Sequence, residues 1–125
     1  MNPYTLQEIK PVLSYIRDHK QERDVLYVYY GAQPAFEYYS RRYGLKDYIL
    51  DPERYWLSYD LGKLRQNVRS LDRLRGHPRI WILFSHIHSN AQHDEEFYLY
   101  RLDEIGKRLD SFTSAGTAVY LYDLE

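Results

Sequence analysis

The sequence contains no cysteine, a single methionine, and no apolar run long enough to cross a bilayer. Without cysteine the chain has no disulfide bond, no thiolate metal ligand and no cysteine nucleophile. Its net charge is only −1, from 17 basic and 18 acidic residues, so the domain as a whole does not attract nucleic acid or an anionic membrane. No signal peptide precedes the first predicted helix, and we expect the chain as given to be soluble.

Tyrosine is what the chain has in abundance, at 15 of its 125 residues. The mean hydropathy of −0.68 is low because hydropathy scales treat tyrosine as weakly polar. Aromatic rings nevertheless bury large areas, and 44% of the residues are hydrophobic, so an adequate core is expected. A chain of this length is typical of one domain. We therefore predict a single globular domain over residues 1–125.

Two apolar runs end abruptly in small or polar residues. Residues 25–30 (VLYVYY) are followed by a Gly-Ala-Gln-Pro turn, and residues 80–84 (IWILF) are followed by a Ser-His pair. Each run predicts a buried strand that leads through a turn into a helix. Ligands of such α/β sheets bind beyond the carboxyl ends of the strands. The candidate ligand-binding residues are therefore Tyr30, Gly31, Gln33, Ser85 and His86.

Apolar spacing places four helices around these strands. They are predicted over residues 6–16, 34–43, 61–74 and 94–109. In the first of them Pro11 predicts either a start near Lys10 or a kink at the proline. Residues 48–50 predict a short strand, and a Ser-Ala-Gly turn before residues 119–122 predicts a terminal hairpin. This alternation predicts a three-layer α/β/α sandwich with a mostly parallel sheet and a C-terminal antiparallel hairpin. We expect a Rossmann-like topology without the dinucleotide-binding motif.

The histidines after the second run offer one alternative function, a small metal-dependent hydrolase. His86 and His88 fall on the same side of an extended segment, and Asp94 could add an oxygen ligand. A catalytic zinc site needs three convergent protein ligands, and no other histidine pair supports this one. We therefore favour a polar loop, and predict neither a metal site nor another cofactor.

The Gly31 turn offers a second alternative, a phosphate- or nucleotide-binding module. A strand, a glycine and a helix N-terminus together can cradle a phosphate. The dinucleotide fingerprint needs three spaced glycines, whereas only Gly31 is present and Pro34 removes one amide donor. A tight structural turn is the simpler interpretation. Ser85 and His86 are adjacent, which is poor spacing for a nucleophile and its base, and we predict no catalytic residue.

Two further groups of residues, one aromatic and one basic, could bind ligands, but each also has a structural explanation. Aromatic residues near residues 51–54 suit sugar rings, but the packing of a loop accounts for them in a tyrosine-rich chain. These residues are Tyr48, Tyr55, Trp56 and Tyr59. Basic residues on the third helix could meet phosphates, but they are also typical of a solvated helix face, and we expect no nucleic-acid partner. These residues are Lys63, Arg65, Arg69, Arg73 and Arg75.

Four segments carry a resemblance to a known family. They are IKPVLxYI at residues 9–16, DVLYVYYGAQPAFxYY at 24–39, RIWILFSH at 79–86 and GxxVYLYDL at 116–124. They resemble the soluble tail of bacterial membrane proteins similar to the dolichyl-phosphate-mannose-protein mannosyltransferase family, whose integral-membrane enzymes use lipid-linked sugars. The resemblance implies an extracytoplasmic domain at the carboxyl end of a multi-span glycosyltransferase-like protein.

The same resemblance implies partners and a role. The catalytic acidic residue and the lipid-sugar site of that family belong to the membrane part, so no catalytic residue is carried over to this chain. The implied partners are the membrane-embedded part of the same or an associated protein, and a carbohydrate or lipid-linked sugar. We therefore expect a non-catalytic accessory domain that serves substrate or partner binding.

Overall fold

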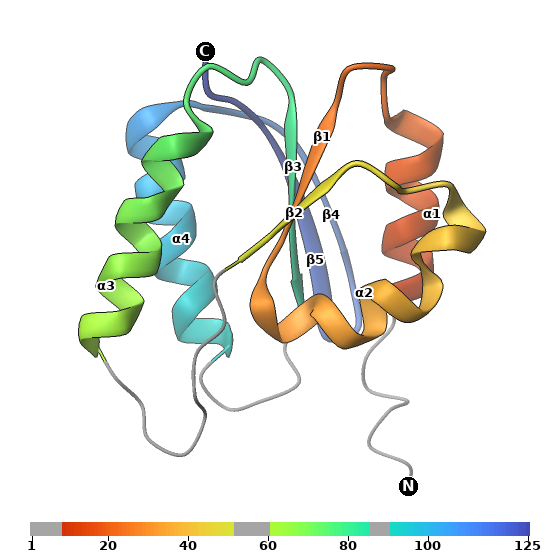
Figure 1. The fold of residues 1–125 in the computed structure, drawn as a ribbon, viewed down its shortest axis with the longest axis horizontal. Coiled ribbons are helices and arrows are strands. Elements are labelled where there is room, and N and C mark those ends of the chain that lie inside the picture. The colour runs from red at the N-terminus through yellow and green to blue at the C-terminus, as the bar shows by residue number, and fades with distance from the viewer. Residues whose placement is uncertain (1–8, 52–60, 86–90) are drawn as a thin grey trace, which may run out of the picture.

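The computed structural model describes residues 9–51, 61–85 and 91–125, which form a mixed α/β unit around one five-stranded sheet (Figure 1). Its α-helices are α1 (Ile9–His19), α2 (Gln33–Tyr39), α3 (Leu61–Ser70) and α4 (Ala91–Ile105). Its strands are β1 (Val25–Val28), β2 (Tyr48–Leu50), β3 (Ile80–Ser85), β4 (Lys107–Ser114) and β5 (Thr117–Asp123). Short 3-10 helices are η2 (Tyr30–Ala32), η3 (Ser40–Tyr43) and η4 (Leu71–Leu74).

The strand order is β2-β1-β3-β5-β4. β1 pairs in parallel with β2 and with β3, whereas β5 is antiparallel to both β3 and β4. The predicted terminal hairpin is confirmed, but the sheet is mixed rather than mostly parallel. The reason is that the apolar strand of the hairpin, β5, takes the inner position beside β3, and the polar strand β4 forms the edge.

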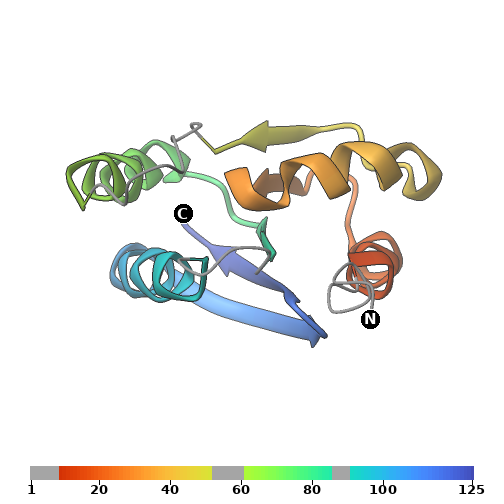
Figure 2. The same ribbon diagram turned by 90° about the horizontal axis from the view of Figure 1, so that it is seen from below.

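Helices lie on both faces of the sheet (Figure 2). Because side chains alternate along a strand, β3 divides its apolar residues between the two faces. Trp81 and Leu83 pack with residues of α1 and α2, whereas Ile82 and Phe84 pack with residues of η4 and α4. Every residue of β3 is buried, as its continuous apolar run predicts.

Several boundaries differ from the predicted ones, and two of them affect the strands. β1 ends at Val28 rather than at residue 30, because Tyr30 already belongs to η2. α4 ends at Ile105, and Leu109, predicted on its apolar face, lies in β4 and is 43% exposed. The helix ends where the chain passes close to the end of β5. A Cβ atom on Gly106 would lie 2.4 Å from the backbone oxygen of Asp123, so only glycine fits there.

A buried aspartate joins the amino ends of β1 and β3. Asp24 accepts hydrogen bonds from Arg79 Nε at 2.9 Å, from Trp81 Nε1 at 2.9 Å and from the Gln21 amide at 3.0 Å. Burial by itself would favour the neutral acid, but these donors and the charge of Arg79 outweigh it, so the pKa of Asp24 lies below its usual value. Asp24 therefore stays ionised and fixes this end of the sheet.

α1 is attached to the hairpin by an aromatic contact. The Tyr15 ring stacks on Phe112 with centroids 4.5 Å apart, and its hydroxyl donates to Asp110 of β4 at 2.5 Å.

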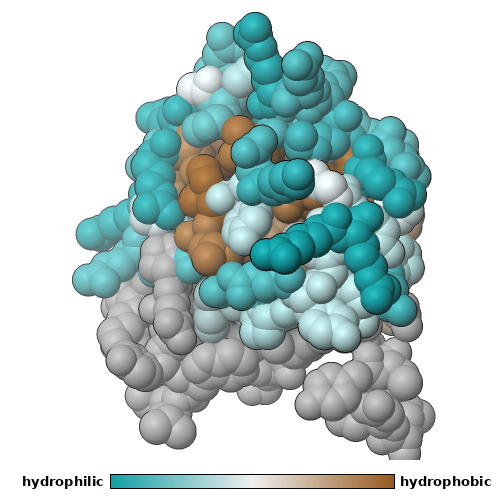
Figure 3. Space-filling model, turned by 45° about the vertical axis from the view of Figure 1, so that its right-hand side comes forward, coloured by the Kyte–Doolittle hydropathy of each residue, from teal (hydrophilic) through white to brown (hydrophobic). Residues whose placement is uncertain are grey.

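Figure 3 shows the side of the molecule toward α1 and α2, where hydrophilic side chains surround a smaller apolar area. The other face of the sheet carries α3 and α4 (Figure 2).

Candidate ligand-binding site at the carboxyl ends of the strands

The carboxyl ends of the three parallel strands, β1, β2 and β3, lie at the same end of the sheet, which we call the carboxyl edge. Val28 is in register with Leu50 of β2 and with Leu83 of β3, and backbone hydrogen bonds extend this alignment beyond β1. The Tyr29 amide donates to the Leu83 carbonyl at 3.0 Å, and the Asp51 amide donates to the Val28 carbonyl at 2.8 Å. The residues that follow each strand are therefore held side by side.

The predicted residues Tyr30 and Gly31 lie in η2, directly after β1, and both are buried. Two amides of this turn already have acceptors. The Tyr30 amide donates to Asp51 Oδ2 at 3.3 Å, and the Ala32 amide donates to the Tyr29 carbonyl at 2.8 Å. A carboxylate beside the turn repels a phosphate, and α2, which follows, has only seven residues. This geometry does not favour the phosphate-binding alternative.

The other predicted residues occupy different positions at this edge. Gln33 is partly exposed, and its side-chain amide donates to Glu37 at 3.1 Å along α2. Ser85 is fully buried at the end of β3. Alternation places Ser85 on the face of Trp81 and Leu83, whereas Tyr30 packs on the opposite face of the sheet. His86, and the alternative metal ligand His88, lie outside the described residues.

Thr117 lies directly opposite Ser85 in the pairing of β3 with β5. It is 1% exposed, and within the described part of the chain its hydroxyl has no hydrogen-bond partner. A buried hydroxyl without a partner costs about 1–3 kcal/mol. Sequence reasoning did not single out Thr117, because a threonine after a turn is an ordinary start of a strand.

Asp51 is the residue at this edge whose importance the sequence did not reveal. It is 3% exposed and accepts a hydrogen bond from Tyr27 Oη at 2.5 Å and from Tyr98 Oη at 2.7 Å. It therefore connects β1, β2 and α4. Its only signal in the sequence is a weak one: an aspartate between a short strand and a proline also fits a simple turn.

Tyr29 forms a second buried pair with a carboxylate of α4. Its hydroxyl donates a short hydrogen bond to Asp94, which is fully buried. Burial, followed by the hydrogen bond to the carboxylate, raises the pKa of Tyr29 far above its usual value. Burial and then the charge of Asp51 raise the pKa of Tyr27 in the same direction. Both hydroxyls therefore remain protonated donors.

Two more tyrosine–carboxylate pairs attach α4 to β5. Tyr120 Oη donates to Glu95 at 2.5 Å, and Tyr122 Oη donates to Asp103 at 2.5 Å. Burial is the largest cause that raises the pKa of both tyrosines, followed by their hydrogen bonds to these carboxylates. The same side-chain chemistry thus recurs from the carboxyl edge along the length of α4.

The metal alternative gains no support from the described residues. Asp94 is committed to Tyr29, and among the residues that the structure describes no three His, Asp or Glu side chains are arranged to hold a metal ion. Within the same ranges, none of the helices is long and apolar enough to cross a membrane.

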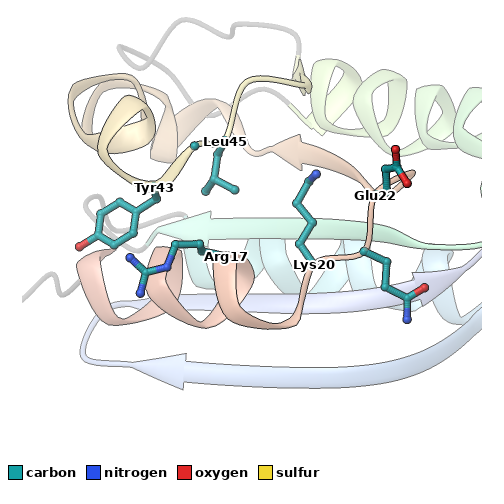
Figure 4. Close-up of a pocket in the computed structure, with 7 residues that line it drawn as sticks. Arg17, Lys20, Glu22, Tyr43 and Leu45 are labelled. Atoms are coloured by element: carbon teal, nitrogen blue, oxygen red, sulfur yellow. The ribbon is translucent and has the colours of Figure 1, made fainter.

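A hollow of about 210 Å³ lies at the other end of the molecule (Figure 4). Its lining includes Arg17 and Lys20 of α1, Tyr43 and Leu45 after α2, and Glu22 before β1. The guanidinium of Arg17 lies over the Tyr43 ring, 5.3 Å from its centroid. Because these residues precede β1 or follow α2, the hollow is separate from the carboxyl edge and contains none of the predicted ligand-binding residues.

Comparison with protein-family models, with curated proteins and with solved structures finds no match for this chain.

Proposed function

We propose that this chain is a non-catalytic accessory domain that binds a sugar-bearing ligand at the carboxyl ends of β1, β2 and β3. We place it in, or beside, a membrane glycosyltransferase-like protein, on the extracytoplasmic face, with the membrane-embedded part as its partner. The resemblance carried by residues 9–16, 24–39, 79–86 and 116–124 supports this context. For the fold we propose a three-layer, Rossmann-like arrangement without the dinucleotide motif.

The observation that carries the proposal is the Asp51 cluster. Asp51 holds the hydroxyls of Tyr27 and Tyr98 and the amide of Tyr30 at the strand ends. These groups form a fixed scaffold of donors and acceptors, which is the arrangement that fixes a polar ligand in a chosen orientation. Sugar hydroxyls both donate and accept hydrogen bonds, so they match tyrosine, serine and glutamine side chains.

The protonation states at this edge favour binding over catalysis. A general base must be able to take up a proton near the working pH. The raised pKa of Tyr27 and of Tyr29 keeps both hydroxyls protonated, and each is already committed to a carboxylate. Their chemistry at neutral pH is therefore that of hydrogen-bond donors.

Exposure separates the residues that can touch a ligand from those that support them. Gln33 is partly exposed and Tyr30 retains 9% of its surface, whereas Ser85 is fully buried. We therefore assign direct contact to Tyr30 and Gln33, and assign Ser85 and Gly31 to the scaffold behind them.

Titration calorimetry with mannose and a mannose oligosaccharide tests the proposal. We expect binding in the millimolar range, weakened at least several-fold by Gln33→Ala and unchanged by Tyr38→Ala, a matched change at an exposed residue of the same helix. A soluble short-chain isoprenyl phosphomannose serves as donor in a parallel transfer assay, where we expect no turnover. Transfer by the chain alone, or an absence of binding at 20 mM sugar, would contradict the proposal.

A further inference from the structure

The near-zero net charge conceals two oppositely charged helices. Residues 61–76, which include α3 and η4, carry five basic residues and one acidic residue, Asp72. The 15 residues of α4 carry five acidic residues and one basic residue, Arg101. Asp72 and Arg101, the two exceptions, pair with each other at 2.7 Å. Asp94 and Glu95 are buried and accept hydrogen bonds from Tyr29 and Tyr120, and Asp103 pairs with Arg108. The exposed surface therefore combines basic residues of α3 with Glu96 and Glu104 of α4.

These helices lie side by side on one face of the sheet, as both ribbon views show (Figures 1 and 2). Arg65 and Arg69 of α3 are exposed, and neither forms an ion pair with an acidic side chain in the described ranges. They are one helical turn apart, so their like charges disfavour the helix slightly unless an acidic partner approaches. Glu96 and Glu104 of α4 are also exposed, and Glu104 lies 3.6 Å from Arg101 of its own helix.

Exposed aromatic residues lie on α4 between these glutamates in sequence. Phe97 is 50% exposed and Tyr100 is 70% exposed. Aromatic side chains that are exposed in a monomer are enriched at protein interfaces, where each contributes a large buried area. We name the surface formed by Arg65, Arg69, Glu96, Phe97, Tyr100 and Glu104 the α3–α4 face.

We propose that the α3–α4 face is the interface of a homodimer. The two-fold axis lies between the two copies, parallel to the helices and in front of the space between α3 and α4. It brings α3 of one copy opposite α4 of the other. The basic helix of each copy then faces the acidic helix of the other, so the same contact occurs twice and the surface is complementary to itself, as a two-fold interface requires. Phe97 and Tyr100 of both copies then meet near the axis, inside a rim of opposite charges.

The charge pattern favours a second copy of the chain over an anionic lipid surface or a nucleic acid. An anionic lipid surface or a nucleic acid would satisfy Arg65 and Arg69 but would also meet the exposed Glu96 and Glu104 of the neighbouring helix. Like charges at such short range oppose binding. A second copy is the partner that satisfies both helices at once. This inference is independent of the sugar site, which lies at the carboxyl ends of the strands.

Paired charge reversals test the dimer. One variant carries Arg65→Glu and Arg69→Glu, and the other carries Glu96→Arg and Glu104→Arg. Each variant has two helices of like charge, so we expect each to be monomeric by sedimentation velocity, whereas the unaltered chain is dimeric. An equimolar mixture restores both complementary contacts, and we expect it to form a mixed dimer. Circular dichroism checks that each variant is folded.

A second pair of variants tests the aromatic centre. Removing the rings with Phe97→Ala and Tyr100→Ala should raise the dimer dissociation constant at least tenfold, while Tyr38→Ala, at a residue 74% exposed on α2, should leave it unchanged. A monomeric unaltered chain at 200 μM, or a mixture of the charge-reversed variants that stays monomeric, would overturn the proposal. Flotation of a monomeric chain with phosphatidylglycerol vesicles, lost in the Arg65→Glu, Arg69→Glu variant, would also overturn it.

Discussion

At the scale of single residues, buried carboxylates with several donors hold the strands together. Asp24 does so at the amino ends of β1 and β3, and Asp51 does so at the carboxyl ends of β1 and β2. Burying a carboxylate is costly unless hydrogen bonds compensate for the lost water. Both aspartates meet this condition, and both therefore make the fold sensitive to substitution and to pH.

Asp51→Asn should destabilise the protein strongly. The amide keeps the size of the side chain but replaces one acceptor oxygen with an NH2 group, which then faces a hydroxyl donor of Tyr27 or Tyr98. We expect a loss of about 2–4 kcal/mol in the free energy of unfolding, measured by urea denaturation. The matched change Asp47→Asn, at an exposed residue, should alter it by less than about 0.5 kcal/mol. Equal effects of the two changes would show that Asp51 has no special role.

The pH dependence of stability should contain a contribution from Asp24. Its pKa is lower in the folded protein than in the unfolded chain, so folding favours the ionised form. The stabilisation is present above the unfolded pKa of about 3.9 and is lost as the pH falls through the lower folded value. The stability gap between the unaltered protein and Asp24→Asn, measured by urea denaturation, should therefore shrink between pH 5 and pH 2. A gap that is constant over this range would refute the assignment.

Thr117→Val should leave stability unchanged or raise it. The substitution keeps the side-chain shape and removes a buried hydroxyl that has no hydrogen-bond partner in the described ranges. We expect a gain of up to about 1–2 kcal/mol in the free energy of unfolding. The control, Thr113→Val, changes an exposed residue of β4. A clear loss of stability for Thr117→Val would mean that the hydroxyl has a bound partner in solution.

At the scale of elements, the sequence predicted most of the fold because the apolar periodicity is strong. The terminal hairpin and the strand at residues 48–50 lie where expected, and the two long runs became adjacent strands. The end of α4 was mispredicted because helical spacing continues to Leu109, whereas the close approach at Gly106 ends the helix. Such an approach depends on where β5 runs, and local sequence does not contain that information.

The site was less predictable than the fold for the same reason. Tyr30, Gly31 and Ser85 could be placed at the carboxyl edge, because strand ends are visible in the apolar pattern. The hydrogen bond of Tyr27 to Asp51 spans 24 residues, and that of Tyr29 to Asp94 spans 65. Pairs so distant in the chain become visible only when the sheet is assembled. The abundance of tyrosine was the one signal, and it did not show which carboxylates the hydroxyls meet.

Gly106→Ala tests the close approach at the junction of α4 and β4. The added Cβ atom would meet Leu124 Cδ2 at 2.3 Å and the Asp123 carbonyl at 2.4 Å, and the carbonyl belongs to the backbone, which moves only at a cost. We expect a loss of more than about 2 kcal/mol in the free energy of unfolding, with a lower thermal midpoint. Gly44→Ala is the comparison, because no atom lies within 4 Å of its Cβ position and only its φ of 67° opposes alanine. Its cost should be about 1 kcal/mol. An equal or larger cost at Gly44 would argue against a close approach at Gly106.

At the scale of the whole molecule, the two proposed sites use different parts of the same sheet. The polar groups that follow the parallel strands lie at the carboxyl edge. The α3–α4 face is the outer surface of the helices that cover one side of the sheet. A dimer formed through α3 and α4 therefore leaves Gln33, on α2 at the other face, accessible to a ligand. The proposed sugar site can thus be tested without first settling the oligomeric state.

The most direct test of the proposed sugar site at the carboxyl ends of the strands is an amide-shift titration. Isotope-labelled protein is titrated with a mannose oligosaccharide, and the backbone amide resonances are followed by NMR. We predict saturable shifts at Tyr30, Gly31, Gln33 and Ser85. An absence of shifts at saturating sugar, or shifts confined to the hollow around Arg17 and Lys20, would contradict the account.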